Sequence, residues 1–141
     1  MAGLRLPDSP KVKGLIAELF DPSHRRSWIV MGYKDKDTCT LIDSGEGGIE
    51  NVVPHLKPDS VNYFLIRIPV SEEKTRDIFV QWCGPSVSVI RRGKKKGDLG
   101  KMTDLLSPSH CEIQAAGVIE KVTEEVLLAK SDPTSGSHVI D

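Results

Sequence analysis

The fold is decided by residues 61–83, which read VNYFLIRIPVSEEKTRDIFVQWC. Two apolar runs, 61–70 and 78–83, flank the charged segment 71–77 and are rich in the β-branched and aromatic residues that favour strands. Apolar residues occupy both faces of each run, and a strand that is apolar on both faces lies inside a sheet covered on both sides. We therefore expect two central strands with helices packed above and below them.

Helical patterns occur on both sides of this segment in the sequence. Residues 8–20 begin with Asp8 and Pro10, a capping residue and a first-turn proline, and then repeat apolar residues at the spacing of an amphipathic helix. Further helices are expected at 49–56, interrupted by Pro54, at 99–106 and at 119–127. These helices supply the apolar faces that cover the sheet.

Shorter extended segments complete the sheet. Residues 28–33 and 38–42 read as a hairpin around the turn KDKD, residues 44–48 (SGEGG) as a loop, and residues 111–115 as a further strand. The predicted fold class is α/β (α+β), with a central mixed sheet of five or six strands sandwiched between two pairs of helices, in a single domain over residues 1–130. Residues 131–141 have little to bury and are predicted to form a flexible tail.

The composition is that of a soluble globular protein, with 141 residues, 38% of them hydrophobic and 28% charged. Since no apolar run approaches the roughly 18 residues that would span a bilayer and the start lacks signal-peptide features, we expect a cytoplasmic protein. Cys39, Cys83 and Cys111 are widely separated, which predicts neither a disulfide framework nor a zinc site. They are expected to act as small buried apolar residues.

Positive charge is concentrated in one part of the chain, although the net charge is −1. Residues 74–101 contain only two acidic residues, Asp77 and Asp98. The same residues include eight basic ones: Lys74, Arg76, Arg91, Arg92, Lys94, Lys95, Lys96 and Lys101. We predict that the bases near 74–76 and those near 91–96 converge on one exposed face that binds an acidic partner. The alternative is that the run of charges is only a solvated helix face.

Apolar neighbours are needed beside this basic face. Because an exposed ion pair contributes only about 0.2–1 kcal/mol, much of any lasting affinity must come from apolar contacts. The candidates are Val87, Val89, Ile90 and Leu99.

Catalytic chemistry is not expected, and we predict neither enzyme activity, a cofactor nor a metal. Residues 93–102 (GKKKGDLGKM) lack the spacing of a phosphate-binding loop, with Met102 where a magnesium-binding hydroxyl is needed. The histidines are scattered, and the adjacent His110 and Cys111 point to opposite faces of a strand, so they cannot act together. Trp28 and Trp82 lie in apolar strand contexts and are expected in the core.

The stretch WCGPSVSVIRRG, residues 82–93, resembles the actin-depolymerising-factor homology family, most closely its coactosin and drebrin-like branches. Other pieces agree with that family in order and spacing over roughly residues 10–130, namely WIVMGYKD (28–35), SGEGG (44–48) and SHCEIQAAG (109–117). The resemblance implies a mixed sheet with helices on both sides, which the apolar patterns predict independently.

The same resemblance implies actin binding. It places the start of a long helix, residues 91–96, and the loop 72–77 against actin, the loop being where coactosin-like proteins carry basic residues for filament binding. Gly93, Gly97 and Gly100 weaken this helix by about 1 kcal/mol each relative to Ala, so its start is expected to be frayed or looped, which puts filament severing in doubt.

The favoured hypothesis is a monomeric protein of the actin cytoskeleton that binds the side of actin filaments. Within the same family, the alternative is binding of actin monomers or severing of filaments, as cofilin does. From another class, the alternative that the basic run suggests is a membrane-surface module that binds phosphoinositides. Nucleic-acid binding is the least favoured, because the isoelectric point is near 6.4.

Overall fold

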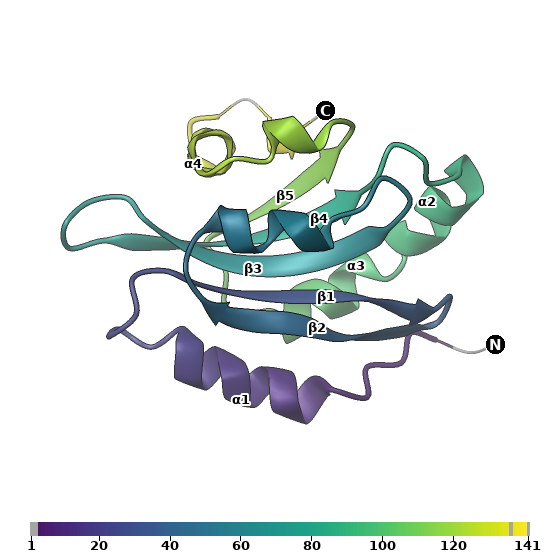
Figure 1. Cartoon of the computed structure of the whole chain (residues 1–141), viewed down its shortest axis with the longest axis horizontal. Coiled ribbons are helices and arrows are strands. Elements are labelled where there is room, and N and C mark those ends of the chain that lie inside the picture. The colour runs from purple at the N-terminus through teal and green to yellow at the C-terminus, as the bar shows by residue number, and fades with distance from the viewer. Residues whose placement is uncertain (1–2, 136, 141) are drawn as a thin grey trace.

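The computed structural model describes residues 3–135 and 137–140, apart from the side chain of Lys94. Its described strands form one six-stranded mixed sheet in the order β2-β1-β3-β4-β5-β6 (Figure 1). The pairs among the first four strands are antiparallel, whereas β4–β5 and β5–β6 are parallel. The strands are β1 (Ser27–Asp35), β2 (Thr38–Glu46), β3 (Val61–Pro69), β4 (Thr75–Cys83), β5 (Cys111–Ala116) and β6 (Val139–Ile140). The predicted mixed sheet is confirmed.

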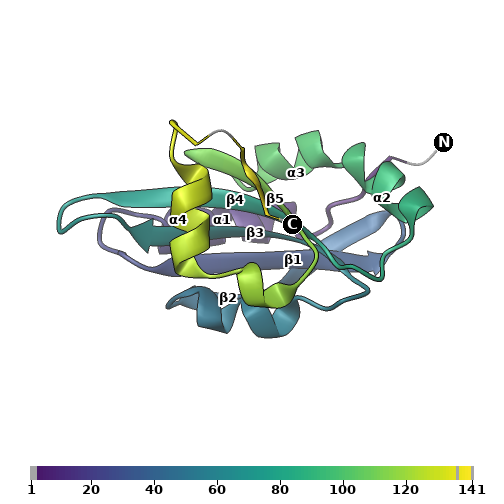
Figure 2. The same ribbon diagram turned by 90° about the horizontal axis from the view of Figure 1, so that it is seen from above.

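Helices cover both faces of this sheet (Figures 1 and 2). On one face, α1 (Ser9–Leu19) and α3 (Leu99–Leu105) pack against a core that includes Leu65 and Phe79. On the other face, α4 (Glu124–Ser131) and two short 3₁₀ helices (Ile49–Asn51 and Val53–His55) enclose Phe64 and Trp82. A third 3₁₀ helix, Ile119–Lys121, precedes α4. The prediction that β3 and β4 are covered on both sides is therefore confirmed.

Both tryptophans lie in the core, as predicted. Trp28 is 5% exposed and Trp82 is 1% exposed. The indole Nε1 of Trp82 donates to the backbone carbonyl of Lys57 at 2.9 Å, which ties β4 to the segment before β3.

The helix expected after β4 is broken into two pieces. The first piece, α2 (Val89–Lys96), is separated from α3 by Gly97 and Asp98. The frayed start predicted from the glycines is wrong, because the backbone is helical from Val89 onward. The interruption falls instead at Gly97, the second of the three glycines and a residue type that weakens a helix.

Several boundaries differ from those predicted. The loop expected at 44–48 begins later, because residues 44–46 continue β2 opposite β1, and the left-handed turn comes at Gly47, whose φ is +123°. β4 begins at Thr75, so Arg76 and Asp77 belong to the strand and not to the loop before it. The last α-helix starts at Glu124, where the hydroxyl of Thr123 caps it.

The C-terminal segment differs from the expected tail with little to bury. Val139 and Ile140 form β6 beside β5, and Ile140 is 2% exposed within the core. Gly136 and Asp141, which fall within the predicted tail, lie outside the described residues. A single buried isoleucine thus attaches the described end of the chain to the sheet.

Candidate functional site

The two groups of predicted basic residues lie at opposite ends of β4. Lys74 immediately precedes this strand and Arg76 is its second residue, whereas α2 follows its far end (Figures 1 and 2). Because β4 has nine residues and each step along a strand is about 3.3 Å, its first and last Cα atoms are roughly 26 Å apart. The prediction that these charges converge on one face is therefore wrong, because the strand that joins them holds them apart.

The first group lies at the turn between β3 and β4, residues 70–74, which we call the hairpin end. Lys74 is exposed there. The turn is braced by Arg25, whose Nη1 donates to the carbonyl of Glu72 at 2.7 Å and whose Nη2 donates to the carbonyl of Ser71. Arg25 was not among the residues predicted from the sequence; the basic pair at 25–26, just before an apolar strand, was the available signal.

The side chain of Arg76 contacts the protein itself and does not project freely into solvent. Its Nη1 donates to Ser131 Oγ at 2.9 Å and to the carbonyl of Leu128 at 3.4 Å. A cation at this point stabilises the C-terminal end of α4, where backbone carbonyls lack helical partners. In this structure Arg76 therefore holds α4 against the sheet.

The second group lies on α2, which has an unusual polarity. The apolar residues of its first turn face solvent, with Val89 85% exposed and Ile90 76% exposed. Of the other apolar residues predicted beside the basic face, Val87 is 6% exposed and Leu99 packs against the core, so neither offers a comparable surface.

Three cationic side chains of α2 donate to backbone carbonyls of other segments. Arg91 binds the carbonyl of Asp59 at 2.9 Å, and Arg92 binds that of Gly84 at 3.1 Å. Lys95 binds the carbonyl of Lys36. We call these three contacts the carbonyl anchors of α2. They attach the helix to three separate segments of the chain.

Lys95 is the most deeply buried of the three and is 5% exposed. Its amine lies 3.7 Å from the centre of the Tyr33 ring and 3.9 Å from Asp98 Oδ2. Burial lowers the pKa of Lys95, while the nearby carboxylate of Asp98 opposes that effect. A cation over an aromatic face in a desolvated site is a favourable contact.

The hydroxyls of Tyr33 and Tyr63 connect this contact to the sheet. The Tyr33 hydroxyl donates to Asp98 Oδ2 at 2.7 Å and lies 2.8 Å from the Tyr63 hydroxyl. Because Tyr33 has a single hydroxyl proton, Tyr63 is the donor between the two tyrosines. Burial raises the pKa of both, that of Tyr63 to about 12. The sequence alone does not connect these tyrosines with the basic segment, because both lie far from it along the chain.

The other predicted residues are placed as follows. Lys96 on α2 and Lys101 on α3 are exposed. The side chain of Lys94 lies outside the described residues. The structure thus brings five of the eight predicted bases, Arg91, Arg92, Lys94, Lys95 and Lys96, onto one short helix and separates Lys74 and Arg76 from them.

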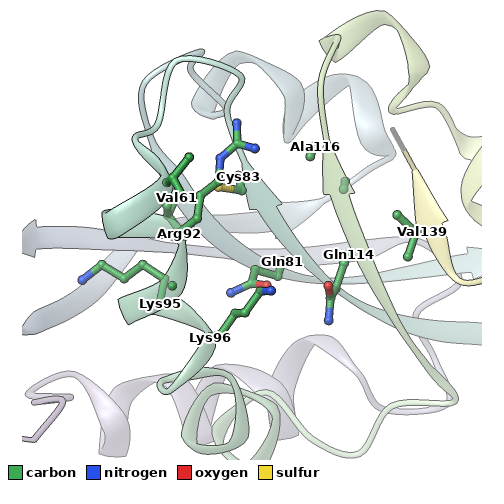
Figure 3. Close-up of a pocket in the computed structure, with 12 residues that line it drawn as sticks. Val61, Gln81, Cys83, Arg92, Lys95, Lys96, Gln114, Ala116 and Val139 are labelled. Carbon is green, nitrogen blue, oxygen red and sulfur yellow. The ribbon is translucent and has the colours of Figure 1, made fainter.

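A hollow of about 420 Å³ lies between α2 and the ends of β4 and β5. Figure 3 shows that Lys95 and Lys96 leave α2 in different directions, with Lys96 toward Gln81. The buried Nε of Arg92, another lining residue, has no hydrogen-bond partner among the described residues. Across that same part of the chain, no group of three or more His, Cys, Asp or Glu could hold a metal ion.

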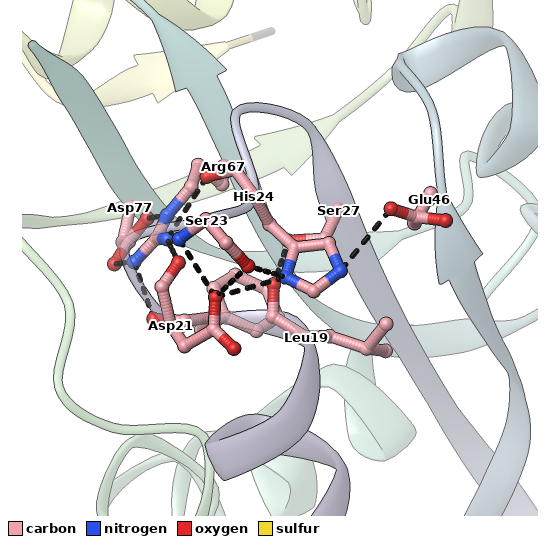
Figure 4. A network of polar contacts seen from close by, with 9 residues as sticks. Leu19, Asp21, Ser23, His24, Ser27, Glu46, Arg67 and Asp77 are labelled. Atoms are coloured by element: carbon pink, nitrogen blue, oxygen red, sulfur yellow. Dashed lines mark hydrogen bonds and ion pairs between the residues drawn. The ribbon is translucent and has the colours of Figure 1, made fainter. Parts of the chain in front are cut away.

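A polar network lies near the hairpin end, at the end of the sheet opposite to α2 (Figure 4). Arg67 and Asp77 form a buried ion pair between β3 and β4, with Nε to Oδ1 at 2.7 Å and Nη2 to Oδ2 at 3.0 Å. The same guanidinium donates to the carbonyls of Phe20, Asp21 and His24. It thereby fixes the chain leaving α1 to the ends of the two central strands.

None of the helices within the described residues is long and apolar enough to cross a membrane.

The architecture is that of the mixed-sheet domains of the actin-depolymerising-factor homology class. Residues 6–132 match the family model described as cofilin/tropomyosin-type actin-binding protein. Since the match covers most of the length of this chain, the chain belongs to this family.

Individual relatives are more distant. Drebrin-like protein A of Xenopus laevis is 24% identical over 129 residues, which cover 90% of this chain and 29% of that protein. Coactosin of Entamoeba histolytica is 23% identical over 125 residues, 84% of each chain. The chain therefore spans less than a third of the drebrin-like relative.

Solved structures share the fold. The crystal structure of the Entamoeba histolytica coactosin superposes with a TM-score of 0.75 at 23% identity, covering 93% of this chain and 96% of that one. Mouse coactosin, described as an actin filament binding protein, gives a TM-score of 0.72 at 14% identity, with 95% and 94% covered.

Proposed function

We propose that the chain binds the side of actin filaments, without catalysis, through two separate contacts. The observation that carries this proposal is the exposure of Val89 and Ile90, at 85% and 76%, in the first turn of α2. Adjacent large apolar residues this exposed are costly to hydrate and indicate a surface that a partner covers. The resemblance of residues 82–93 to the family assigns the same region to actin.

The second contact is the hairpin end, with Lys74 exposed and Arg25 beside it. Because this end and α2 lie beyond opposite ends of β4, a partner that engages both must be large or must present two neighbouring subunits. A filament offers two subunits, which favours the filament over the monomer. The description of mouse coactosin as a filament-binding protein supports the same choice.

The break between α2 and α3 argues against severing. A wedge inserted between subunits needs a stiff helix, and here the helix is interrupted at Gly97 and Asp98. We therefore propose binding of the filament side by a monomeric protein in the cytoplasm. Cofilin-like monomer binding is the alternative within the family.

Phosphoinositide binding is the alternative from another class. Membrane attachment draws on lysines and arginines that point toward the lipid, each worth about 1 kcal/mol. Three of the cations of α2 are instead bound to backbone carbonyls in this structure. Flotation of the protein with liposomes, with and without phosphoinositide, tests this alternative directly.

Cosedimentation with filaments at several salt concentrations, beside a titration with actin monomers, tests the proposal. We expect pelleting with filaments, weakening as salt rises, and weaker binding to monomers. The Lys74→Ala variant should pellet less and with a smaller dependence on salt. Lys11→Ala, a change of an exposed lysine on α1, serves as the matched control. Tight binding to monomers with no pelleting would overturn the proposal.

A further inference from the structure

α2 is attached to the rest of the molecule mainly by polar contacts. Among its described side chains, the one that is buried belongs to Lys95. Val89, Ile90 and Lys96 are exposed, and Gly93 has no side chain to pack. The helix therefore lacks the apolar stripe with which a surface helix is normally held against a core.

The carbonyl anchors divide the attachment between the two halves of α2. Arg91 and Arg92 hold its beginning to the carbonyls of Asp59 and Gly84. Lys95 holds its end, where the chain is about to break at Gly97. Between these points, the space around Gly93 is open within 4 Å of where a side chain would begin. The position of the second half of the helix thus depends on Lys95.

Lys95, Tyr33 and Asp98 form a compact unit, which we call the Tyr33 latch. The lysine amine lies over the Tyr33 ring, and the hydroxyl of that ring donates to Asp98, which is at the junction of α2 and α3. The latch connects β1 to both sides of the junction. Its hydroxyl pair with Tyr63 carries the connection on to β3.

We infer that Lys95 is a positioning residue, which holds α2 in the orientation that presents Val89 and Ile90, and that it does not contact the partner. This inference rests on the proposed function for the identity of the partner, but its structural part stands without it. To reach an acidic partner, the Lys95 amine would have to leave the Tyr33 ring and the carbonyl of Lys36 together. Lys96, next to it and exposed, has no such obstacle.

The test compares four variants of the full chain: Lys95→Met, Tyr33→Leu, their double variant, and Lys96→Met as the matched control. Two quantities are measured, the hydrogen exchange of the α2 amides and the affinity for actin filaments. We expect Lys95→Met and Tyr33→Leu each to speed exchange in α2 and to lower affinity, both by about tenfold, the scale of losing a desolvated cation–π contact. Lys96→Met should leave the exchange unchanged.

The double variant separates positioning from direct contact. If Lys95 acts through Tyr33, removing both residues should weaken binding no more than removing one, because residues in one network are not additive. Lys95→Arg, which keeps a cation over the ring, should restore slow exchange and binding. Should Tyr33→Leu fail to fold, Tyr33→Phe takes its place; it keeps the ring but removes the hydrogen bond to Asp98, and a smaller effect is expected.

Two results would overturn the inference. One is unchanged exchange in α2 for Lys95→Met, which would show that the latch does not hold the helix. The other is a loss of affinity in which the effects of Lys95→Met and Tyr33→Leu simply add, which would make Lys95 a contact residue. If the wild type itself does not pellet, the proposed function fails, and the exchange comparison still decides whether the latch exists.

Discussion

The amine of Lys95 lies 3.7 Å from the centre of the Tyr33 ring, and this contact goes with a reversal of the usual polarity of a surface helix. Arg91, Arg92 and Lys95 of α2 donate to backbone carbonyls of the protein, while the apolar pair Val89 and Ile90 faces solvent. Carbonyl oxygens at the ends of neighbouring strands and turns accept hydrogen bonds from these cations, and the bond from Lys95 to the carbonyl of Lys36 offsets part of the cost of burying its amine. The surface that remains for a partner is apolar with a basic margin.

Replacing helical glycines should stabilise the protein. Gly93 and Gly100 are both in helices, and among the described residues a Cβ added at either would meet no atom within 4 Å beyond its chain neighbours and the backbone of its own helix. We expect Gly93→Ala and Gly100→Ala each to raise the free energy of unfolding by about 0.5–1 kcal/mol, measured by urea denaturation. Gly47→Ala is the opposing control: φ is +123° there and an added Cβ would meet Asn51, so a loss of stability is expected. Equal effects at all three positions would contradict this prediction.

Breaking the Arg67–Asp77 ion pair should be strongly destabilising. Both side chains are at most 10% exposed, and removing one partner leaves the other charge buried without compensation. Arg67→Met should lower the free energy of unfolding by about 3–5 kcal/mol. In the control variant Arg26→Met, which removes the exposed pair with Glu124, the loss should stay below about 1 kcal/mol. A small loss in the first variant would mean that the pair is not the main fastening of α1 to the central strands.

Stability should fall in acid partly because of Asp21. Hydrogen bonds from the hydroxyl and the backbone N–H of Ser23, together with His24, lower the pKa of Asp21 from 3.8 to about 2. Since its pKa is lower in the folded protein than in the unfolded chain, the carboxylate stabilises the fold fully above pH 3.8 and loses this effect as the pH falls toward 2. Unfolding midpoints measured across this range should depend less on pH in Asp21→Asn than in the wild type. Identical pH profiles would remove Asp21 from the explanation.

The central part of the fold could be predicted from local pattern. Residues 61–70 and 78–83 are apolar on both faces whatever the rest of the chain does, and the structure buries them between two helix layers. The two residues of β6 could not be predicted, because so short a strand is defined by its pairing with β5 and not by its own sequence.

The site was harder to predict, because the direction of a charged side chain depends on distant partners. Lys95 is drawn inward by Tyr33 and by a carbonyl on the β1–β2 turn, neither of which is near it in sequence. Arg76 likewise has its partners on α4. The separation of the two basic groups, in contrast, follows from the length of β4 and could have been obtained by counting residues along the strand.

Cosedimentation of the Val89→Ala, Ile90→Ala double variant with actin filaments tests the central claim most directly. Alanine preserves the helix, and the wild-type side chains make surface contacts with solvent, so the unfolding free energy should change by less than about 0.5 kcal/mol. Burying a Val or Ile side chain is worth about 1.5–3 kcal/mol, so we expect affinity for filaments to drop at least about tenfold. A stably folded double variant that pellets as fully as the wild type would contradict the claim that α2 presents these residues to actin.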